Sequence, residues 1–260
     1  MQPSKPEKIA FPSEVRTVAF AGDWHGNGGW AREMIRQLPG QVEVVLHLGD
    51  FGYNFDEGYL NSVNRVAREA DIIVMFIDGN HENFNMLYND WSLEPEGYRK
   101  LRPRVWHLPR NFRWEWSGLK FMAMGGAHSV DRPARTPFLE WWPNETITHA
   151  EFYEAISSGP VDVMLTHDAP AGHTIPGLMP DGFFPADEIR YADQHRGVLR
   201  EIVNATGPKY LWHGHYHSFY RAETDYGLMV TGLHCDGTTF EENIEVVDLK
   251  ELKQLVIKGA

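Results

Sequence analysis

The stretch VRTVAFAGDWHGN, residues 15–27, joins a short β-branched and apolar run to a turn that carries an acid and a histidine. The run VRTVAF (15–20) predicts a buried strand, because it is short, apolar and followed by turn residues. Asp23 and His25 stand two positions apart directly after it. Taken alone, this pair is either a pair of metal ligands or a polar turn, so the rest of the chain has to decide.

Polar residues also follow four further predicted strands. VEVVLHL (42–48) precedes Asp50, IIVMFI (72–77) precedes Asn80 and His81, VDVMLT (161–166) precedes His167, and YLW (210–212) precedes His213, His215 and His217. Ligands of open α/β sheets bind at the carboxyl ends of the strands, so these five strand ends predict one site. In extended backbone, side chains at i and i+2 point to the same face, so each Asp-x-His or His-x-His pair would aim both groups into one cavity.

Strands and helices alternate along most of the chain. Helical spacing in WAREMIRQL (30–38) and LNSVNRVAREA (60–70) predicts two βαβ units with the first three strands. Three short runs, RVWHL (104–108), FRWEW (112–116) and LKFMAMGG (119–126), predict an antiparallel sheet rich in aromatic residues. We therefore expect two stacked sheets with helices outside them.

The second half continues the alternation. Thr148 and Glu151 form a capping box, which predicts a helix over residues 149–158. A long helix is expected from about residue 186 to 205, with strands in GLMVTGL (227–233) and NIEVVDL (243–249). The chain shows no linker, and we expect a single domain over residues 1–260.

Composition limits the classes of function. One cysteine, Cys235, allows neither an intrachain disulfide nor a thiolate zinc site, so any metal must be held by His, Asn and carboxylate ligands. A net charge of −12 disfavours binding to a long nucleic acid, although a small anionic substrate is compatible with local positive charge. The apolar run 72–77 is too short to span a bilayer, and we expect a soluble, cytoplasmic protein with no membrane partner.

The five blocks GDWHG, LGD, GNHE, LTHDAP and HGHYH resemble, in this order, the motifs of the calcineurin-like metallophosphoesterases. They extend over about 195 residues, from Asp23 to His217. The resemblance implies an α/β fold, a four-layer α/β/β/α sandwich of two mixed β-sheets flanked by helices. The stretch GDFGYN lacks the Asp-Arg pair found in many relatives, notably protein phosphatases, and this disfavours a phosphoprotein substrate.

The resemblance also implies a ligand set and a mechanism. One metal ion would be held by Asp23, His25 and His217, the other by Asn80, His167 and His215, and Asp50 would bridge the two. The ions would be Mn, Fe, Zn, Co or Ni, because the ligands include no thiolate. A metal-bridging hydroxide would attack the phosphorus, and His81 would protonate the leaving oxygen, with Asp78 and Glu82 as local candidates to orient it.

The segment 125–145 resembles part of the small bacterial and phage members and carries several basic residues. Of these, His128 and Arg132 are expected to bind substrate, with Arg135 as a further candidate, whereas Trp141 and Trp142 are expected to pack in the core. We expect a phosphodiesterase for small phosphodiesters, including cyclic nucleotides.

Several alternatives stay open at this point. A phosphomonoesterase or a nuclease would use the same ligands, and a catalytically silent scaffold would keep the metals without turnover. Hydrolases of the metallo-β-lactamase type are excluded, because their His-x-His-x-Asp-His block comes early, whereas the His-x-His here is late and is followed by Ser218.

Overall fold

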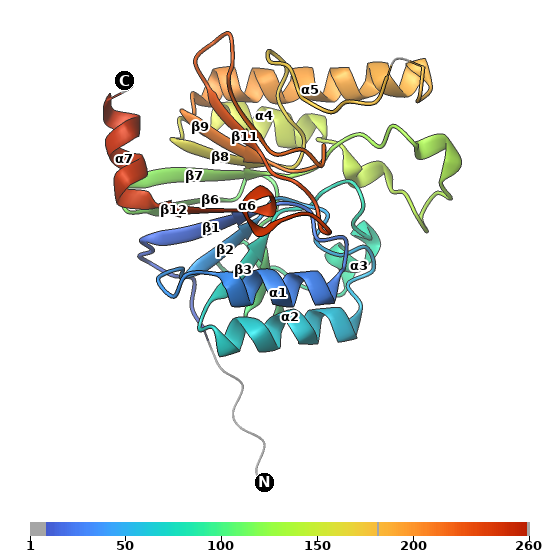
Figure 1. Cartoon of the computed structure of the whole chain (residues 1–260). Helices are drawn as coiled ribbons and strands as arrows, with labels where there is room; N and C mark the ends of the chain where they lie inside the picture. The colour runs from blue at the N-terminus through green and yellow to red at the C-terminus, as the bar shows by residue number, and fades with distance from the viewer. Residues whose placement is uncertain (1–8, 181, 259–260) are drawn as a thin grey trace.

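The computed structural model describes residues 9–180 and 182–258, so the predicted domain 1–260 extends beyond the described residues at both ends. Two six-stranded mixed sheets lie face to face (Figure 1). The first sheet, in the order β12-β1-β2-β3-β5-β4, contains β1 (Thr17–Ala21), β2 (Val44–His47), β3 (Ile73–Phe76), β4 (Arg99–Arg102), β5 (Val105–His107) and β12 (Ile244–Asp248). The second, in the order β10-β11-β9-β8-β7-β6, contains β6 (Arg113–Trp116), β7 (Leu119–Met124), β8 (Val163–Thr166), β9 (Tyr210–His213), β10 (Tyr220–Glu223) and β11 (Met229–Gly232).

Helices cover both outer faces, with α1 and α2 on one side and α4 and α5 on the other (Figure 1). The helices are α1 (Gly28–Gln37), α2 (Glu57–Glu69), α3 (Phe84–Asn89), α4 (His149–Ser157), α5 (Ala186–Thr206), α6 (Phe240–Asn243) and α7 (Leu249–Lys258). The fold is therefore the α/β/β/α sandwich expected from the sequence. Among the described helices, none is long and apolar enough to cross a bilayer.

Three apolar clusters hold the four layers together. Between the sheets, Phe20 stacks on Trp212 with ring centroids 4.0 Å apart, and α7 adds Leu252 to this cluster. A second cluster joins α1 and α2 to the first sheet, and a third joins α4 and α5 to the second sheet. Because burial of apolar area is the main driving force for folding, these clusters hold α1, α2, α4, α5 and α7 against the sheets.

The four predicted helices correspond to α1, α2, α4 and α5, whereas α3, α6 and α7 were not predicted. Thr148 caps α4, accepting from the backbone N–H of Glu151, whose carboxylate accepts from the N–H of Thr148. The helix expected at about 186–205 is α5, and Gly207 ends it in the left-handed conformation with φ 63°. This residue has no Cβ to oppose that conformation.

One predicted sheet is wrong. The strand in RVWHL, β5, joins the first sheet parallel to β3, whereas β6 and β7 form an antiparallel pair at the edge of the second sheet. Val105 lies beside Val74 in that register. The expectation of a three-stranded antiparallel sheet failed because three consecutive strands do not have to pair with one another.

Candidate metal centre

The carboxyl ends of parallel strands from both sheets meet at one place. Strands β1, β2 and β3 run parallel in the first sheet, and β7, β8 and β9 run parallel in the second. The strand ends β1, β2, β3, β8 and β9 are the five that the sequence predicts to carry ligands. The recurring pattern thus corresponds to one spatial cluster.

Asp23 is the centre of a first group of candidate ligands. Its side chain is fully buried, and its Oδ2 lies 3.2 Å from Nε2 of His217 and 3.9 Å from Nε2 of His25. One ligand atom from each of these three residues lies within 4.8 Å of the others. These are the three residues expected to hold one ion.

Asp50 lies between this group and a second one. Its Oδ2 is 3.7 Å from Nε2 of His25 and 3.5 Å from Nε2 of His167. Asp23, Asp50 and His167 also form a cluster within 4.8 Å. A carboxylate in this position reaches both groups, as the expected bridging ligand must.

The other two expected ligands surround His167. Its Nε2 is 3.0 Å from Oδ1 of Asn80, and its ring centroid is 5.0 Å from that of His215. Burial lowers the pKa of His215 to about 4. At neutral pH this imidazole is therefore neutral, which is the form that binds a metal. The structure brings all seven predicted ligand residues to one place.

The i, i+2 argument assumed extended backbone at these residues, and this assumption is wrong. His25, Asp50, His215 and His217 all have positive φ, between 47° and 69°. Each ligand pair therefore lies in a tight turn, and the turns, not strand alternation, direct the side chains inward. Non-glycine residues in this region carry strain that clusters at functional sites.

Two glycines allow the turns to approach the carboxylates. A Cβ at Gly79 would lie 2.2 Å from Oδ1 of Asp50, and one at Gly214 would lie 2.0 Å from Oδ1 of Asp23. Any larger residue at either position would displace a ligand. The glycines in GNHE and HGHYH are thus required by the site.

The electrostatics of the cluster favour a bound cation. Burial disfavours the charged form of His167, yet the carboxylates of Asp50 and Asp23 outweigh it and raise its pKa to about 10. Burial likewise opposes protonation of His217, but mainly its hydrogen bond with Asp23 raises its pKa to about 11. Two buried carboxylates that draw protons onto neighbouring imidazoles would bind a divalent metal in their place. Carboxylate, imidazole and amide oxygen are a suitable donor set for such ions.

Further residues contact the candidate ligands and orient them. The sequence did not predict these further residues. Asp236 Oδ1 lies 2.8 Å from Nδ1 of His25, which leaves Nε2 directed at Asp23. Histidine ligands commonly carry such a carboxylate partner. Asp236 follows β11, which runs parallel to β9, so its place after a strand was a usable signal.

A second chain of hydrogen bonds orients Asn80. The Nδ2 group of Asn80 donates to Ser129 Oγ at 2.9 Å, and Ser129 Oγ donates to Glu145 at 2.6 Å. This turns Asn80 Oδ1 towards His167. Burial, opposed by the bonds to Ser129, raises the pKa of Glu145 to about 7.

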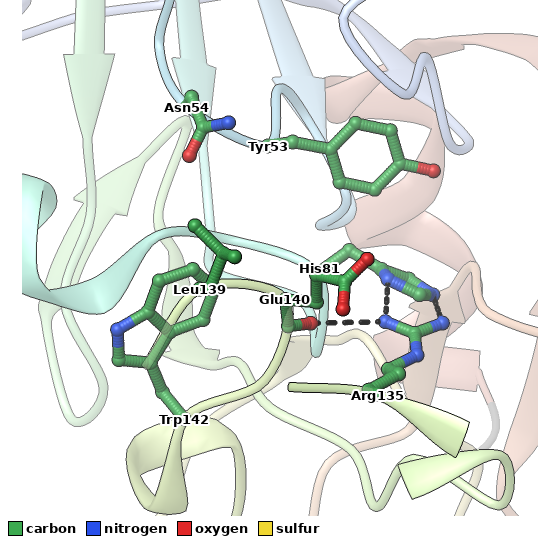
Figure 2. Close-up of a pocket in the computed structure, with 7 residues that line it drawn as sticks. All are labelled: Tyr53, Asn54, His81, Arg135, Leu139, Glu140 and Trp142. Carbon is green, nitrogen blue, oxygen red and sulfur yellow. Dashed lines mark hydrogen bonds between the residues drawn. The ribbon is translucent and has the colours of Figure 1, made fainter. Parts of the chain in front are cut away.

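His81 lies at the edge of the cluster, with Nε2 3.9 Å from Asp50 Oδ2. Arg135 contacts both of its ring nitrogens, with 3.0 Å between Nη2 and Nε2 (Figure 2). Burial lowers the pKa of His81, and Asp50 opposes this shift. Neither candidate orienting residue approaches its ring: Asp78 binds Arg110 and His107, and Glu82 accepts from backbone N–H groups.

The two residues expected to bind substrate are engaged elsewhere. Glu188 of α5 lies 2.7 Å from Nε2 of His128 and accepts from Arg132 at 2.7 Å. Neither is among the described residues that line the pocket beside His81: Tyr53, Asn54, His81, Arg135, Leu139, Glu140 and Trp142. Of the three basic residues considered, Arg135 is the one that reaches this pocket.

Comparison with known proteins agrees with this geometry. The model of the family described as calcineurin-like phosphoesterase matches residues 16–219. A lariat debranching enzyme from Schizosaccharomyces pombe is 24% identical over 192 residues, which cover 67% of this chain and 37% of that protein. An uncharacterised protein from Haemophilus influenzae is 22% identical over 239 residues, which cover 83% of this chain and 90% of that protein.

Among solved structures, a dimetal phosphatase from Danio rerio has a similar fold. Its TM-score is 0.56 at 13% identity, with 90% of this chain and 93% of that chain covered. At 13% identity, this similarity shows a shared fold alone. The matched residues span little more than a third of the Schizosaccharomyces pombe enzyme. The activity of that enzyme is therefore not assigned to this chain.

Proposed function

This chain belongs to the calcineurin-like phosphoesterase family, and we propose that it is a phosphodiesterase that acts on small phosphodiesters, including cyclic nucleotides. The family makes it a metal-dependent phosphoester hydrolase, and the ligand cluster fits that chemistry. The preference for a diester is our proposal.

In this proposal the seven clustered side chains hold two metal ions. Asp23, His25 and His217 hold one, Asn80, His167 and His215 hold the other, and Asp50 reaches both. When bound, the two ions supply a nucleophilic water at neutral pH and neutralise the phosphoryl oxygens. The metals are Mn, Fe, Zn, Co or Ni, because the ligands are of mixed nitrogen and oxygen type.

His81 serves as the general acid that gives a proton to the leaving oxygen. It borders both the ligand cluster and the pocket, so a substrate whose phosphate lies at the ligands would place an ester oxygen beside its ring. Arg135 opposes protonation of His81 by its charge. A phosphate anion paired with Arg135 would cancel that charge and favour the protonated imidazole.

The charge of the pocket is the observation that carries the preference for a diester. One arginine lines it, and that arginine already donates to Asp131 at 2.7 Å. A glutamate, Glu140, also lines it. A phosphodiester carries one negative charge, whereas a monoester carries up to two, so this pocket suits the diester better.

The composition of the chain bears on the nuclease alternative and on the cellular location. A net charge of −12 disfavours a long nucleic acid as substrate, because the chain has no overall excess of Lys and Arg to pair with phosphates. The single cysteine is the support for a cytoplasmic location in this proposal.

Steady-state kinetics with matched aryl substrates tests the proposal. Protein reconstituted with Mn²⁺ is assayed on bis(p-nitrophenyl) phosphate and on p-nitrophenyl phosphate. We expect the higher kcat/KM for the diester. A higher kcat/KM for the monoester would contradict the proposal, and turnover of neither by protein with bound metal would indicate a silent scaffold.

A further inference from the structure

Glu188 is a buried carboxylate in the first turn of α5, and it bonds to the segment 125–145. One of its oxygens lies 2.7 Å from Nε2 of His128, and the other accepts from Nη2 of Arg132 at 2.7 Å. A buried charge needs such partners, because it has lost its hydration. The carboxylate therefore links α5 to the segment that borders the pocket.

The guanidinium of Arg132 also contacts two aromatic rings. Its Cζ lies 5.4 Å from the ring centroid of Trp141 and 5.5 Å from that of Tyr191. Trp141 belongs to the same segment as Arg132, whereas Tyr191 lies one turn after Glu188 in α5. These distances are within the range of cation–π contacts. Arg132 is thus held against α5 by an ion pair and by a ring.

A single turn joins this fixed arginine to Arg135. The 3-10 helix η1 spans Arg132–Ala134, and the backbone N–H of Arg135 donates to the carbonyl of Arg132 at 3.0 Å. Pro133 restricts the backbone within the turn. The Nη2 group of Arg135 also donates to Asp131 at 2.7 Å. A shift of Arg132 would therefore move Arg135 with it.

Arg135 faces the site with donors that His81 cannot satisfy. Its guanidinium contacts both ring nitrogens of His81 (Figure 2). A guanidinium only donates, and a neutral imidazole accepts at one nitrogen alone, so at most one of these contacts is a hydrogen bond. The planar fork of donors matches the oxygens of a phosphate. A phosphoryl oxygen at the ligand cluster would accept from Arg135 where His81 cannot.

The ion pair of Glu188 with Arg132 suits positioning better than stability. Their side chains are 7% and 32% exposed, so both charges have lost much of their hydration. Such pairs contribute little net stability compared with apolar residues of similar volume. What the pair does provide is one defined arrangement of the segment 125–145 against α5.

We propose that Glu188 is a positioning residue for the substrate phosphate. It fixes Arg132 against α5, and through η1 it sets the place of Arg135, whose guanidinium binds an oxygen of the phosphoryl group. The inference rests on the proposed placement of the phosphate at the ligand cluster, and it holds for a diester and a monoester alike.

Calorimetric titration of Mn²⁺-loaded protein with inorganic phosphate tests this. Arg135→Ala should raise the Kd of phosphate about tenfold or more, as expected for loss of a hydrogen bond between charged groups. Glu188→Gln keeps the size of the side chain but not its charge, and it should raise this Kd about threefold or more. Arg132→Gln should reproduce that rise. In protein that already carries Arg135→Ala, Glu188→Gln should have no further effect.

Steady-state kinetics separates positioning from folding. On the better of the two aryl phosphates, Glu188→Gln should raise KM, whereas a loss of folded protein would lower kcat alone. Asp187→Asn is the matched control, because its side chain is 79% exposed beside Glu188, and it should change neither Kd nor KM. Elemental analysis should find the same metal content in all these variants.

An unchanged Kd of phosphate in Glu188→Gln would overturn the inference. An equal rise of Kd with and without Arg135→Ala would also overturn it, because Glu188 would then not act through the arginine. Loss of Mn²⁺ from Glu188→Gln would overturn it by placing the effect at the metal ligands. A higher kcat/KM for the monoester would instead contradict the proposed function and leave this inference standing.

Discussion

The amide of Asn80 shows how single residues outside the ligand set control the site. Asn80 can direct either its oxygen or its nitrogen inward, and Ser129 fixes the choice by accepting from Nδ2. Replacing Ser129 with Ala should therefore lower the affinity for one of the two ions about 10- to 100-fold, the usual effect of losing an outer-shell partner. Titration of apo-protein with Co²⁺, followed by its absorption, measures this.

Ser157→Ala is the matched control, because Ser157 is exposed and its hydroxyl donates to the carbonyl of Glu154 within α4. An unchanged affinity for both ions in Ser129→Ala would show that the hydrogen-bond chain does not orient Asn80.

His81 is tested by the dependence of the rate on the leaving group. His81→Ala should slow an alkyl phosphodiester about 10²- to 10⁴-fold, the usual contribution of a general acid. It should slow a nitrophenyl diester far less, because nitrophenolate leaves without a proton. Metal content should stay that of the unmodified protein. Equal losses on both substrates with the metals bound would mean that His81 contacts the phosphoryl group instead.

The sequence predicted which residues cluster at the strand ends better than it predicted the groups around them. The ligands stand in short motifs after apolar runs, so their convergence follows from parallel strands. Arg132 and Arg135 stand three positions apart in one basic segment, and no local signal distinguishes them. Only the tertiary partner does: Arg132 pairs with Glu188, whereas Arg135 contacts His81.

At the scale of elements, Arg110 connects the end of β3 to the segment 125–145. Its buried guanidinium donates to Asp78 Oδ2 at 2.9 and 2.7 Å and to the carbonyls of Asn144, Glu145 and Thr146. Replacing Arg110 with Met should lower the free energy of unfolding by about 3–5 kcal/mol, because the buried carboxylate of Asp78 would lose its guanidinium partner and keep His107 alone of the two. Urea denaturation followed by circular dichroism measures this loss.

Arg190→Met is the control for that measurement, because Arg190 forms an exposed pair with Asp187 and should not shift the unfolding midpoint. A similar midpoint for both variants would show that the buried pair is not needed for the fold.

The strands that the sequence missed lack apolar runs. Strands β4 (RKLR) and β10 (YRAE) lie at the edges of their sheets, and their charged residues mask the strand pattern. The pairing of β5 with β3 was missed for another reason. An apolar run indicates that a strand exists, whereas its neighbour is set by the packing of the whole sheet.

At the scale of the molecule, the two sheets bring together candidate ligands that lie about 195 residues apart in the sequence. Asp23 follows β1 of the first sheet and His217 follows β9 of the second, yet their nearest side-chain atoms are 3.2 Å apart. Folding of both sheets is therefore coupled to the site. Chelation of the metals should lower the midpoint of thermal unfolding, because metal bound only to the folded state stabilises it. Differential scanning calorimetry with and without EDTA measures this, and an unchanged midpoint after verified metal loss would contradict the coupling.

The metal content of the protein and of Asp50→Ala tests the central claim most directly. Asp50 lies within 4 Å of one histidine from each ligand group, His25 and His167, so its loss should affect the binding of both ions. Elemental analysis of protein reconstituted with Mn²⁺ and freed of excess metal should give about two equivalents per chain, as expected of a two-metal site, and Asp50→Ala should retain one or fewer. A single tightly bound equivalent that is unaffected by Asp50→Ala would contradict the dinuclear centre.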